Sequence, residues 1–479
     1  MSSAGGKVVL AGRESASGVF HAVLLEALEA YPESLSRVGL PEQAGVFKKR
    51  YGEVLPRFEA ARVAGDARLG IARRLVAALQ RRISWKDDRG ERPLAAALTE
   101  AAEPLTLQTH RFDGAPGWQP SLVYQGERWG SDLLPELGAD LVGRGMASKA
   151  AGEALSWLVA DGMGDEGLDL RGRKIVVLGA GAEMAPTRFW LEAGADVLWL
   201  DVAPPPAAWR EVTGMAGRLF WPAENVDLLT RPQQALATIN AFGDGEPLDL
   251  GLYAYAPGQA RELLLTAIMN AIVAALPRER LASVTLLVSP TTPTALGPED
   301  LAAMHRRFEA RPGWEALLAR VGLFGRGGGC AVSGTGSATR TVVAIQGGSY
   351  QAAQYLGKVM VAESWASQTE DERIQPVRVS ANTAAITRTR SLNHPVFAAA
   401  FGGAAAFGVE TFAPRLSRRL NGLLAAQDWL NPRLPVPGAV RVHGGIHTLP
   451  YPLDPPLRVA AAIGFARSPR LLRGLIGGR

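Results

Sequence analysis

Glycines in the middle of the chain have the spacing of a loop that binds phosphate. Gly179 and Gly181 stand in the run Val-Val-Leu-Gly-Ala-Gly-Ala-Glu-Met-Ala, directly after an apolar segment. The first glycine permits a tight turn out of a strand, and the second lets the backbone approach a pyrophosphate. A helix that follows such a turn offers its unsatisfied N–H groups to the anion. The predicted cofactor-binding loop contains Gly179, Ala180, Gly181, Ala182 and Ala185.

A carboxylate follows this loop at the distance expected for a ribose ligand. Asp201 ends the next apolar segment, 20 residues after Gly181. An acid at that point accepts hydrogen bonds from the hydroxyl groups of a ribose. Open α/β sheets bind ligands at the carboxyl ends of their strands, so residues that follow later strands belong to the same crevice. Asp227 and Tyr255 complete the predicted cofactor-binding set on that basis.

The strand, the glycine-rich turn, the helix and the second strand ending in Asp201 resemble the first β-α-β unit of NAD(P)-binding Rossmann domains. The resemblance implies a doubly wound, mostly parallel sheet and NAD or NADP as cofactor. Asp201 favours NAD, because its charge would repel the 2′-phosphate of NADP. The chain departs from the family pattern at Met184, which stands where the third glycine is expected.

The same residues also fit two other functions. Methyltransferases that use S-adenosylmethionine have a similar glycine-rich turn and a similar acid, and Asp227 would then contact the adenine. They usually carry an acid in or just before the loop, whereas Val-Val-Leu precedes Gly179 here. A nucleotide-binding protein without catalysis is the third interpretation. The sequence favours an NAD(P)-dependent oxidoreductase that acts on a small organic substrate.

Candidate catalytic residues lie beyond the loop. Short-chain dehydrogenases use a tyrosine and a lysine four positions apart, where the lysine lowers the tyrosine pKa and a serine holds the substrate oxygen. Ser289 follows an apolar segment at the place of that serine. Tyr355 and Lys358 stand three positions apart and share a helix face. We predict these three residues as the catalytic group.

No metal site is predicted. His443 and His447 stand four positions apart, but two glycines between them argue against the helix that would hold both on one ion. Cys330 is the one cysteine of the chain, which excludes an internal disulfide and fits a cytoplasmic protein.

The elements that must position these residues follow from the apolar pattern. Apolar residues recur at helical spacing through 20–28, 51–58 and 71–79, so 1–168 is predicted to be a mainly helical N-terminal domain. Short apolar runs then alternate with helical segments, which predicts a Rossmann-type nucleotide-binding domain over 169–365 and a mainly helical region over 366–479. The nucleotide-binding domain is expected to have strands at 174–178, 196–201, 248–255 and 283–289. Its expected helices are 187–193, 232–242 and 260–276. The runs 325–336 and 341–345 are expected to add late strands to the same sheet.

The charge balance limits the partners. The net charge is +5, but no zinc-finger, ribonucleoprotein or basic-zipper pattern accompanies it, so we expect no nucleic acid partner. The apolar run at 397–409 is too short to span a bilayer and is predicted to lie in a core or a homodimer contact. The tail from 457 to 479 alternates apolar clusters with arginines. Packing within the chain or in a dimer is predicted for it, ahead of peripheral contact with a membrane.

Overall fold

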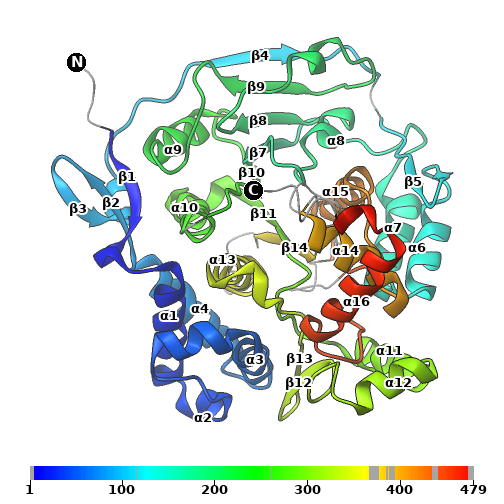
Figure 1. The fold of residues 1–479 in the computed structure, drawn as a ribbon. Helices are drawn as coiled ribbons and strands as arrows, with labels where there is room; N and C mark the ends of the chain where they lie inside the picture. The colour runs from blue at the N-terminus through cyan, green and yellow to red at the C-terminus, as the bar shows by residue number, and fades with distance from the viewer. Residues whose placement is uncertain are drawn as a thin grey trace.

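A seven-stranded sheet runs through the middle of the molecule (Figure 1). The computed structural model describes residues 5–115, 117–258, 260–365, 377–383, 387, 394–433 and 441–472. The strands of the sheet are β4 (Leu107–Arg111), β7 (Lys174–Leu178), β8 (Asp196–Leu200), β9 (Arg218–Pro222), β10 (Leu248–Leu252), β11 (Leu281–Val288) and β14 (Arg378–Thr383). They lie in the order β14-β11-β10-β7-β8-β9-β4. Every neighbouring pair is parallel except β9 and β4, which are antiparallel. The predicted α/β class with a mostly parallel sheet is confirmed.

The central strands are apolar because both faces of the sheet are covered. In β7, Val176 belongs to one core and Val177 to the other, and both are fully buried. Runs of this kind are typical of parallel strands with helices on each face. The four predicted strands are confirmed as β7, β8, β10 and β11. The three predicted helices between them are confirmed as α8 (Thr187–Glu192), α9 (Pro232–Ala241) and α10 (Arg261–Ala275).

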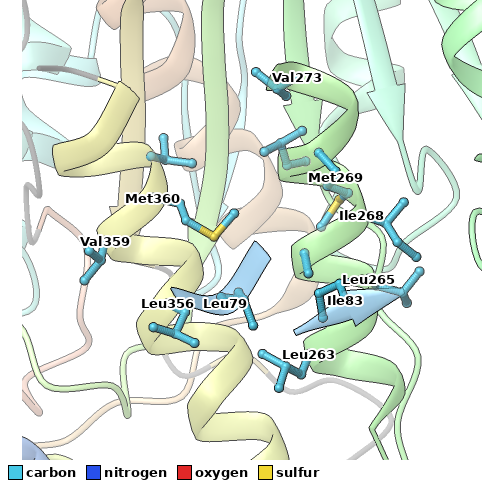
Figure 2. Packing of buried hydrophobic residues seen from close by; sticks show 14 of the residues in the cluster. Leu79, Ile83, Leu263, Leu265, Ile268, Met269, Val273, Leu356, Val359 and Met360 are labelled. Atoms are coloured by element: carbon cyan, nitrogen blue, oxygen red, sulfur yellow. The ribbon is translucent and has the colours of Figure 1, made fainter. Parts of the chain in front are cut away.

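The first face of the sheet is covered by α9, α10 and α13 (Gly348–Val359), and the N-terminal helices pack beneath them. Those helices are α1 (Ala16–Ala30), α3 (Ala44–Val63) and α4 (Arg68–Gln80), which confirm the predicted helical segments. Figure 2 shows Met269 of α10 and Met360, just beyond α13, facing each other across the space between the two helices, with Leu79 of α4 between them. One continuous core therefore joins the N-terminal helices to the sheet.

The second face is covered by α6 (Leu134–Gly143), α7 (Lys149–Trp157), α8 and α15 (Pro414–Leu430). Trp190 of α8 is fully buried, and its ring lies 5.0 Å from that of Trp429 on α15. Aromatic pairs at this separation add to the free energy gained by burial. This contact fixes α15, from the C-terminal part of the chain, against the helix that follows the glycine-rich loop.

The prediction of late strands at 325–336 and 341–345 in the main sheet is wrong. Residues of the first run form the hairpin of β12 (Cys330–Ser333) and β13 (Gly336–Thr339), which is a separate two-stranded sheet. The hairpin packs on α3, where a Cβ on Gly336 would overlap the carbonyl of Ala60. Strand β14 pairs with β11 and forms one edge of the main sheet. The sheet thus takes one edge strand, β4, from the predicted N-terminal segment and the other, β14, from the predicted C-terminal segment.

Two C-terminal helices pack unusually closely. They are α14 (Pro395–Ala404) and α16 (Asp454–Arg467), and they lie side by side. A Cβ on Gly403 would overlap the carbonyl oxygen of Ala460, and a Cβ on Gly464 would overlap that of Ala399. Glycine at these two positions lets the helix backbones touch. The apolar run at 397–409 and the start of the tail therefore pack against each other within the chain.

The remaining elements lie around these layers. A small antiparallel sheet stands beside α1, two short strands lie next to α6, and α11 and α12 lie beside the β12–β13 hairpin (Figure 1). These elements are β1 (Lys7–Leu10), α2 (Pro32–Leu35), β2 (Ile83–Asp87), β3 (Gly90–Pro93), α5 (Leu94–Leu98), β5 (Leu122–Tyr124), β6 (Glu127–Trp129), α11 (Pro298–Glu309) and α12 (Gly313–Arg320). Among the described residues, no helix combines the length and the apolar character that crossing a membrane requires.

Candidate functional site

The glycine-rich loop connects β7 to α8 at the carboxyl end of the sheet. Gly179 has a φ of 82°, and a Cβ there would overlap the backbone of Ala254, so the position needs glycine. Its N–H donates to the carbonyl of Leu200 at 2.8 Å. The N–H groups of Ala182 and Ala185 donate to the carbonyls of Gly179 and Ala182, both at 3.0 Å. Helix α8 therefore begins only after two turns of loop.

Asp201, directly after β8, holds the tip of this loop. Its Oδ2 accepts a hydrogen bond from the N–H of Gly181 at 2.8 Å, and its Oδ1 accepts one from the N–H of Ala203 at 3.2 Å. A Cβ on Gly181 would lie 3.0 Å from the ring of Trp199 and 3.4 Å from Oδ2 of Asp201. The predicted phosphate-binding loop and the predicted ribose ligand are thus in direct contact.

A pocket of about 1240 Å³ opens beside this contact. Six of the predicted cofactor-binding residues lie at or beside it, and five line it: Ala180, Gly181, Ala182, Ala185 and Asp201. The sixth, Gly179, begins the loop. Aromatic side chains form much of the remaining wall: Trp118, Phe189, Trp199 and Trp209. A concave site of this size and lining accommodates a small organic molecule or a nucleotide.

Five arginines from three elements also line the pocket, and sequence reasoning missed them. They are Arg128 of β6, Arg188 of α8, and Arg415, Arg418 and Arg419 of α15. The last three stand at positions i, i+3 and i+4 of one helix, a spacing that places them on one face. That spacing was a signal available in the sequence, but nothing in the sequence placed α15 beside a loop more than two hundred residues earlier.

The pocket arginines share few carboxylates. Glu192 pairs with Arg188 at 3.0 Å and with Arg419 at 3.6 Å. Arg419 also stacks on the ring of Trp118, with 5.6 Å between the guanidinium carbon and the ring centre. Burial lowers the pKa of Arg418; Glu183 opposes this shift, and the like charges of the neighbouring arginines add to it. The pocket is therefore a strongly positive environment.

Asp227 and Tyr255, the other predicted cofactor residues, do not line the pocket. Oδ1 of Asp227 accepts a hydrogen bond from the N–H of Leu229 at 2.9 Å, which caps a turn between β9 and α9. Tyr255 follows β10 and is about half exposed, with its ring 6.3 Å from that of Tyr350. Burial, helped by the charge of Glu262, raises the pKa of Tyr255. Their roles in cofactor binding stay predictions.

Ser289 lies directly after β11, where its hydroxyl is 2.9 Å from that of Thr291. The tyrosine near it is Tyr350, in the first turn of α13, close enough to Ser289 and Thr291 for both side chains to affect its pKa. Burial is the main reason that the pKa of Tyr350 is raised to about 12. The tyrosine–lysine pattern does not point to Tyr350, because the residue four positions later is Gln354 and not a lysine.

Tyr355 and Lys358 lie instead in a buried ionic cluster between α13 and α3. The hydroxyl of Tyr355 donates to Glu59 at 2.8 Å, and Nζ of Lys358 donates to the same carboxylate at 2.7 Å. Arg62 completes the cluster with a bond to Glu59 at 2.8 Å. The cations and hydrogen bonds keep the pKa of Glu59 well below its usual range despite burial. Among the described residues no hydrogen bond joins Tyr355 or Lys358 to Ser289, although Lys358 also donates to the carbonyl of Pro293, four residues after Ser289. The catalytic role of the two residues stays a prediction.

His443 and His447 are fully buried with ring centres 5.2 Å apart. Nδ1 of His443 accepts a hydrogen bond from the N–H of Gly445 at 3.0 Å. Burial lowers the pKa of His443 to about 3. Within the described residues, no three His, Cys, Asp or Glu side chains gather in a group that could hold a metal ion.

Comparisons with known proteins add no name to this site. No model of a known protein family matches the chain. No curated protein matches it either.

Proposed function

We propose that the chain is an NAD(P)-dependent oxidoreductase of Rossmann type that acts on a small organic substrate. The observation that carries the proposal is the contact between Asp201 and Gly181 in the wall of a pocket. A flexible backbone at the end of one strand and a carboxylate at the end of the next are the two parts that bind the pyrophosphate and the ribose of a dinucleotide.

The order of the strands supports the same proposal. Counting β7 as the first strand, the parallel strands β9, β8, β7, β10, β11 and β14 follow the order 3-2-1-4-5-6. That is the strand order of dinucleotide-binding sheets. In these sheets the strands are parallel, and the order in which the chain adds them reverses between the first and the fourth strand. In this chain the reversal falls between β7 and β10, where Gly179 meets Ala254. The glycine-rich loop therefore stands at the point of the sheet where such ligands bind.

Hydride transfer to a carbonyl also needs a group that donates a proton to the substrate oxygen. The hydroxyls of Ser289 and Tyr350 lie at the carboxyl end of β11, on the same edge of the sheet as the loop. They supply hydrogen-bond donors for such an oxygen. We therefore propose that Tyr350 acts with Ser289, while the catalytic roles of Tyr355 and Lys358 stay predictions.

Ligand identification tests the proposal directly. Mass spectrometry of small molecules released from the denatured, purified protein should find NAD(H) or NADP(H). Calorimetry with each dinucleotide should then give a measurable Kd, which Gly181→Val abolishes because its side chain fills the space next to Asp201. The control is Gly143→Val at the end of α6, where a Cβ meets open space.

The thermal unfolding of both variants shows whether the fold is kept. Release of an S-adenosyl compound, or unchanged dinucleotide binding by folded Gly181→Val, overturns the proposal.

A further inference from the structure

The pocket beside the glycine-rich loop holds more positive charge than a pyrophosphate at this loop needs. Its walls include five arginines but two carboxylates, Glu192 and Asp201. Glu192 is shared between Arg188 and Arg419. Asp201 meets the N–H groups of Gly181 and Ala203. The lining as a whole carries three positive charges in excess.

Gathering these cations has an energetic cost. Glu183 attracts Arg418, but Arg415, Arg188 and Arg419 each act on it as a like charge, and Arg418 is itself partly buried. Like charges that are held together by a fold are relieved when a ligand of opposite charge binds between them. Guanidinium groups also match the geometry of phosphate oxygens, to which they donate two hydrogen bonds at once.

We propose that Arg188, Arg415 and Arg418 hold the 2′-phosphate of an adenosine ribose, so that the chain prefers NADP(H) over NAD(H). This inference rests on the proposed function and specifies its cofactor. Asp201 considered alone favours NAD. The arginines reverse that preference, because they line the same pocket as the ribose ligand and outnumber its carboxylates.

Calorimetry on the full chain with NADP⁺ and NAD⁺ tests this preference. We expect NADP⁺ to bind at least about tenfold more tightly, the scale of one charged hydrogen bond. Arg418→Gln should remove most of that difference and leave the Kd of NAD⁺ unchanged. The matched control is Arg458→Gln, which removes an exposed arginine that pairs with Asp454 on α16 and should change neither Kd.

The outcomes separate this inference from the proposed function. Binding of NAD⁺ as tight as that of NADP⁺ overturns the preference and leaves the proposed function standing. An equal loss for both cofactors in Arg418→Gln also overturns it, because the arginines would then contact the shared pyrophosphate. If neither dinucleotide binds, the proposed function itself fails.

A second inference comes from an independent observation on α11 and α12. Five large apolar side chains are exposed on α11, on α12 and just after it: Phe308, Trp314, Leu317, Val321 and Leu323, with exposed fractions between 41% and 62%. Trp314, Leu317 and Val321 stand at helical spacing, which places them on one face. We call these five residues the α12 surface.

Basic residues surround the α12 surface. Arg306, Arg320 and Arg326 are exposed, and the guanidinium of Arg311 lies 3.7 Å from the ring centre of Phe308. The nearby acids are Glu309, which is exposed, and Glu315, which is buried. A second copy of the same surface, related by a twofold axis, would bring these cations face to face. An anionic bilayer instead attracts the arginines and takes up the apolar side chains.

The geometry points to peripheral binding of the α12 surface to anionic lipid. Co-sedimentation of the full chain with phosphatidylcholine vesicles, with and without phosphatidylglycerol, tests it. We expect pelleting with the anionic vesicles, weakened by salt and lost in Leu317→Glu. The control is Val123→Glu on β5, another exposed apolar position outside the surface, which should still pellet.

Failure to pellet with anionic vesicles, or pelleting of Leu317→Glu like the parent, overturns this inference. A dimer in light scattering that Leu317→Glu abolishes also overturns it, because the surface would then bind a second copy.

Discussion

Asp201 combines two tasks at one carboxylate, because it holds the N–H of Gly181 and faces the pocket. We expect Asp201→Ala to weaken NAD binding by about 1–2 kcal/mol, the scale of a charged hydrogen bond. The binding of NADP should be weakened less than that of NAD, because the variant also removes a carboxylate that repels the 2′-phosphate. Calorimetry with both dinucleotides measures the ratio of the two Kd values.

The control for this prediction is Glu246→Ala, which removes an exposed glutamate that pairs with Lys174 and does not line the pocket. It should leave both Kd values unchanged. An unchanged ratio in Asp201→Ala would remove the ribose role from this residue.

Glu59 is the partner of three buried groups, Arg62, Tyr355 and Lys358. Removing one member of a buried charge cluster leaves the others uncompensated, so Glu59→Ala should lower the free energy of unfolding by about 3–5 kcal/mol. Glu53→Ala, on the same helix, removes an exposed glutamate that pairs with two exposed arginines and should cost at most about 1 kcal/mol. Urea unfolding of both variants measures the difference, and equal effects would contradict this account of the cluster.

The candidate site could be predicted from the sequence only where its residues act locally. Gly181 and Asp201 are 20 residues apart and follow successive strands, so their spacing alone indicated that they meet. Arg418 and Trp118 line the same pocket from opposite ends of the chain. Their placement depends on the packing of α15 against α8, which no local pattern encodes.

The elements divide in the same way. Strands β7, β8, β10 and β11, with mostly apolar side chains, were visible in the sequence. Strand β9 was missed although Leu219 and Trp221 are buried, and β14 was missed because its inward residues are polar. Ser380 and Asn382 are buried there with Asp428 of α15 as hydrogen-bond partner. Strand β4 was missed because it is an antiparallel edge strand with mostly exposed side chains. Hydropathy detects strands that are buried among apolar groups. It misses strands whose buried side chains are polar and form hydrogen bonds.

Adjacent glycines on α14 offer a matched test of close helix packing. Gly403→Ala places a methyl group against the carbonyl of Ala460 on α16, so we expect a loss of about 1–3 kcal/mol of stability, as for an overpacked core. Gly402→Ala meets open space and should raise stability by up to about 1 kcal/mol through helix propensity. Thermal unfolding of the two variants compares them, and a loss of stability in both would refute the close contact as the cause.

The whole molecule should lose stability in mild acid because of its buried histidines. The pKa of His443 is lowered to about 3, mainly by burial and also by Arg307, and that of His447 lies well below 6.5 for the same main reason. As the pH falls below 6.5, the unfolded chain takes up these protons before the folded chain does. The free energy of unfolding therefore decreases, by about 1.4 kcal/mol per pH unit for each histidine once the unfolded form is protonated.

Urea unfolding between pH 7 and pH 4 measures this slope. His443→Gln, whose amide oxygen can still accept from Gly445, should have a shallower slope than the parent protein. Parallel slopes for parent and variant would show that carboxylates alone cause the acid loss.

The edge position of β4 also has a consequence for the order in which the chain is made. Its partner β9 follows about 110 residues later in the chain. Because a ribosome adds about 5–20 residues per second, β9 is synthesised roughly 5 to 20 s after β4, and β4 has no strand to pair with until then. Glu59 and Arg62 are made almost together, whereas Lys358 follows Glu59 by 299 residues, which takes roughly 15 to 60 s to synthesise. During synthesis the N-terminal helices therefore present a core surface with nothing to cover it. Their final packing is a late event that depends on strands and helices near the other end of the chain.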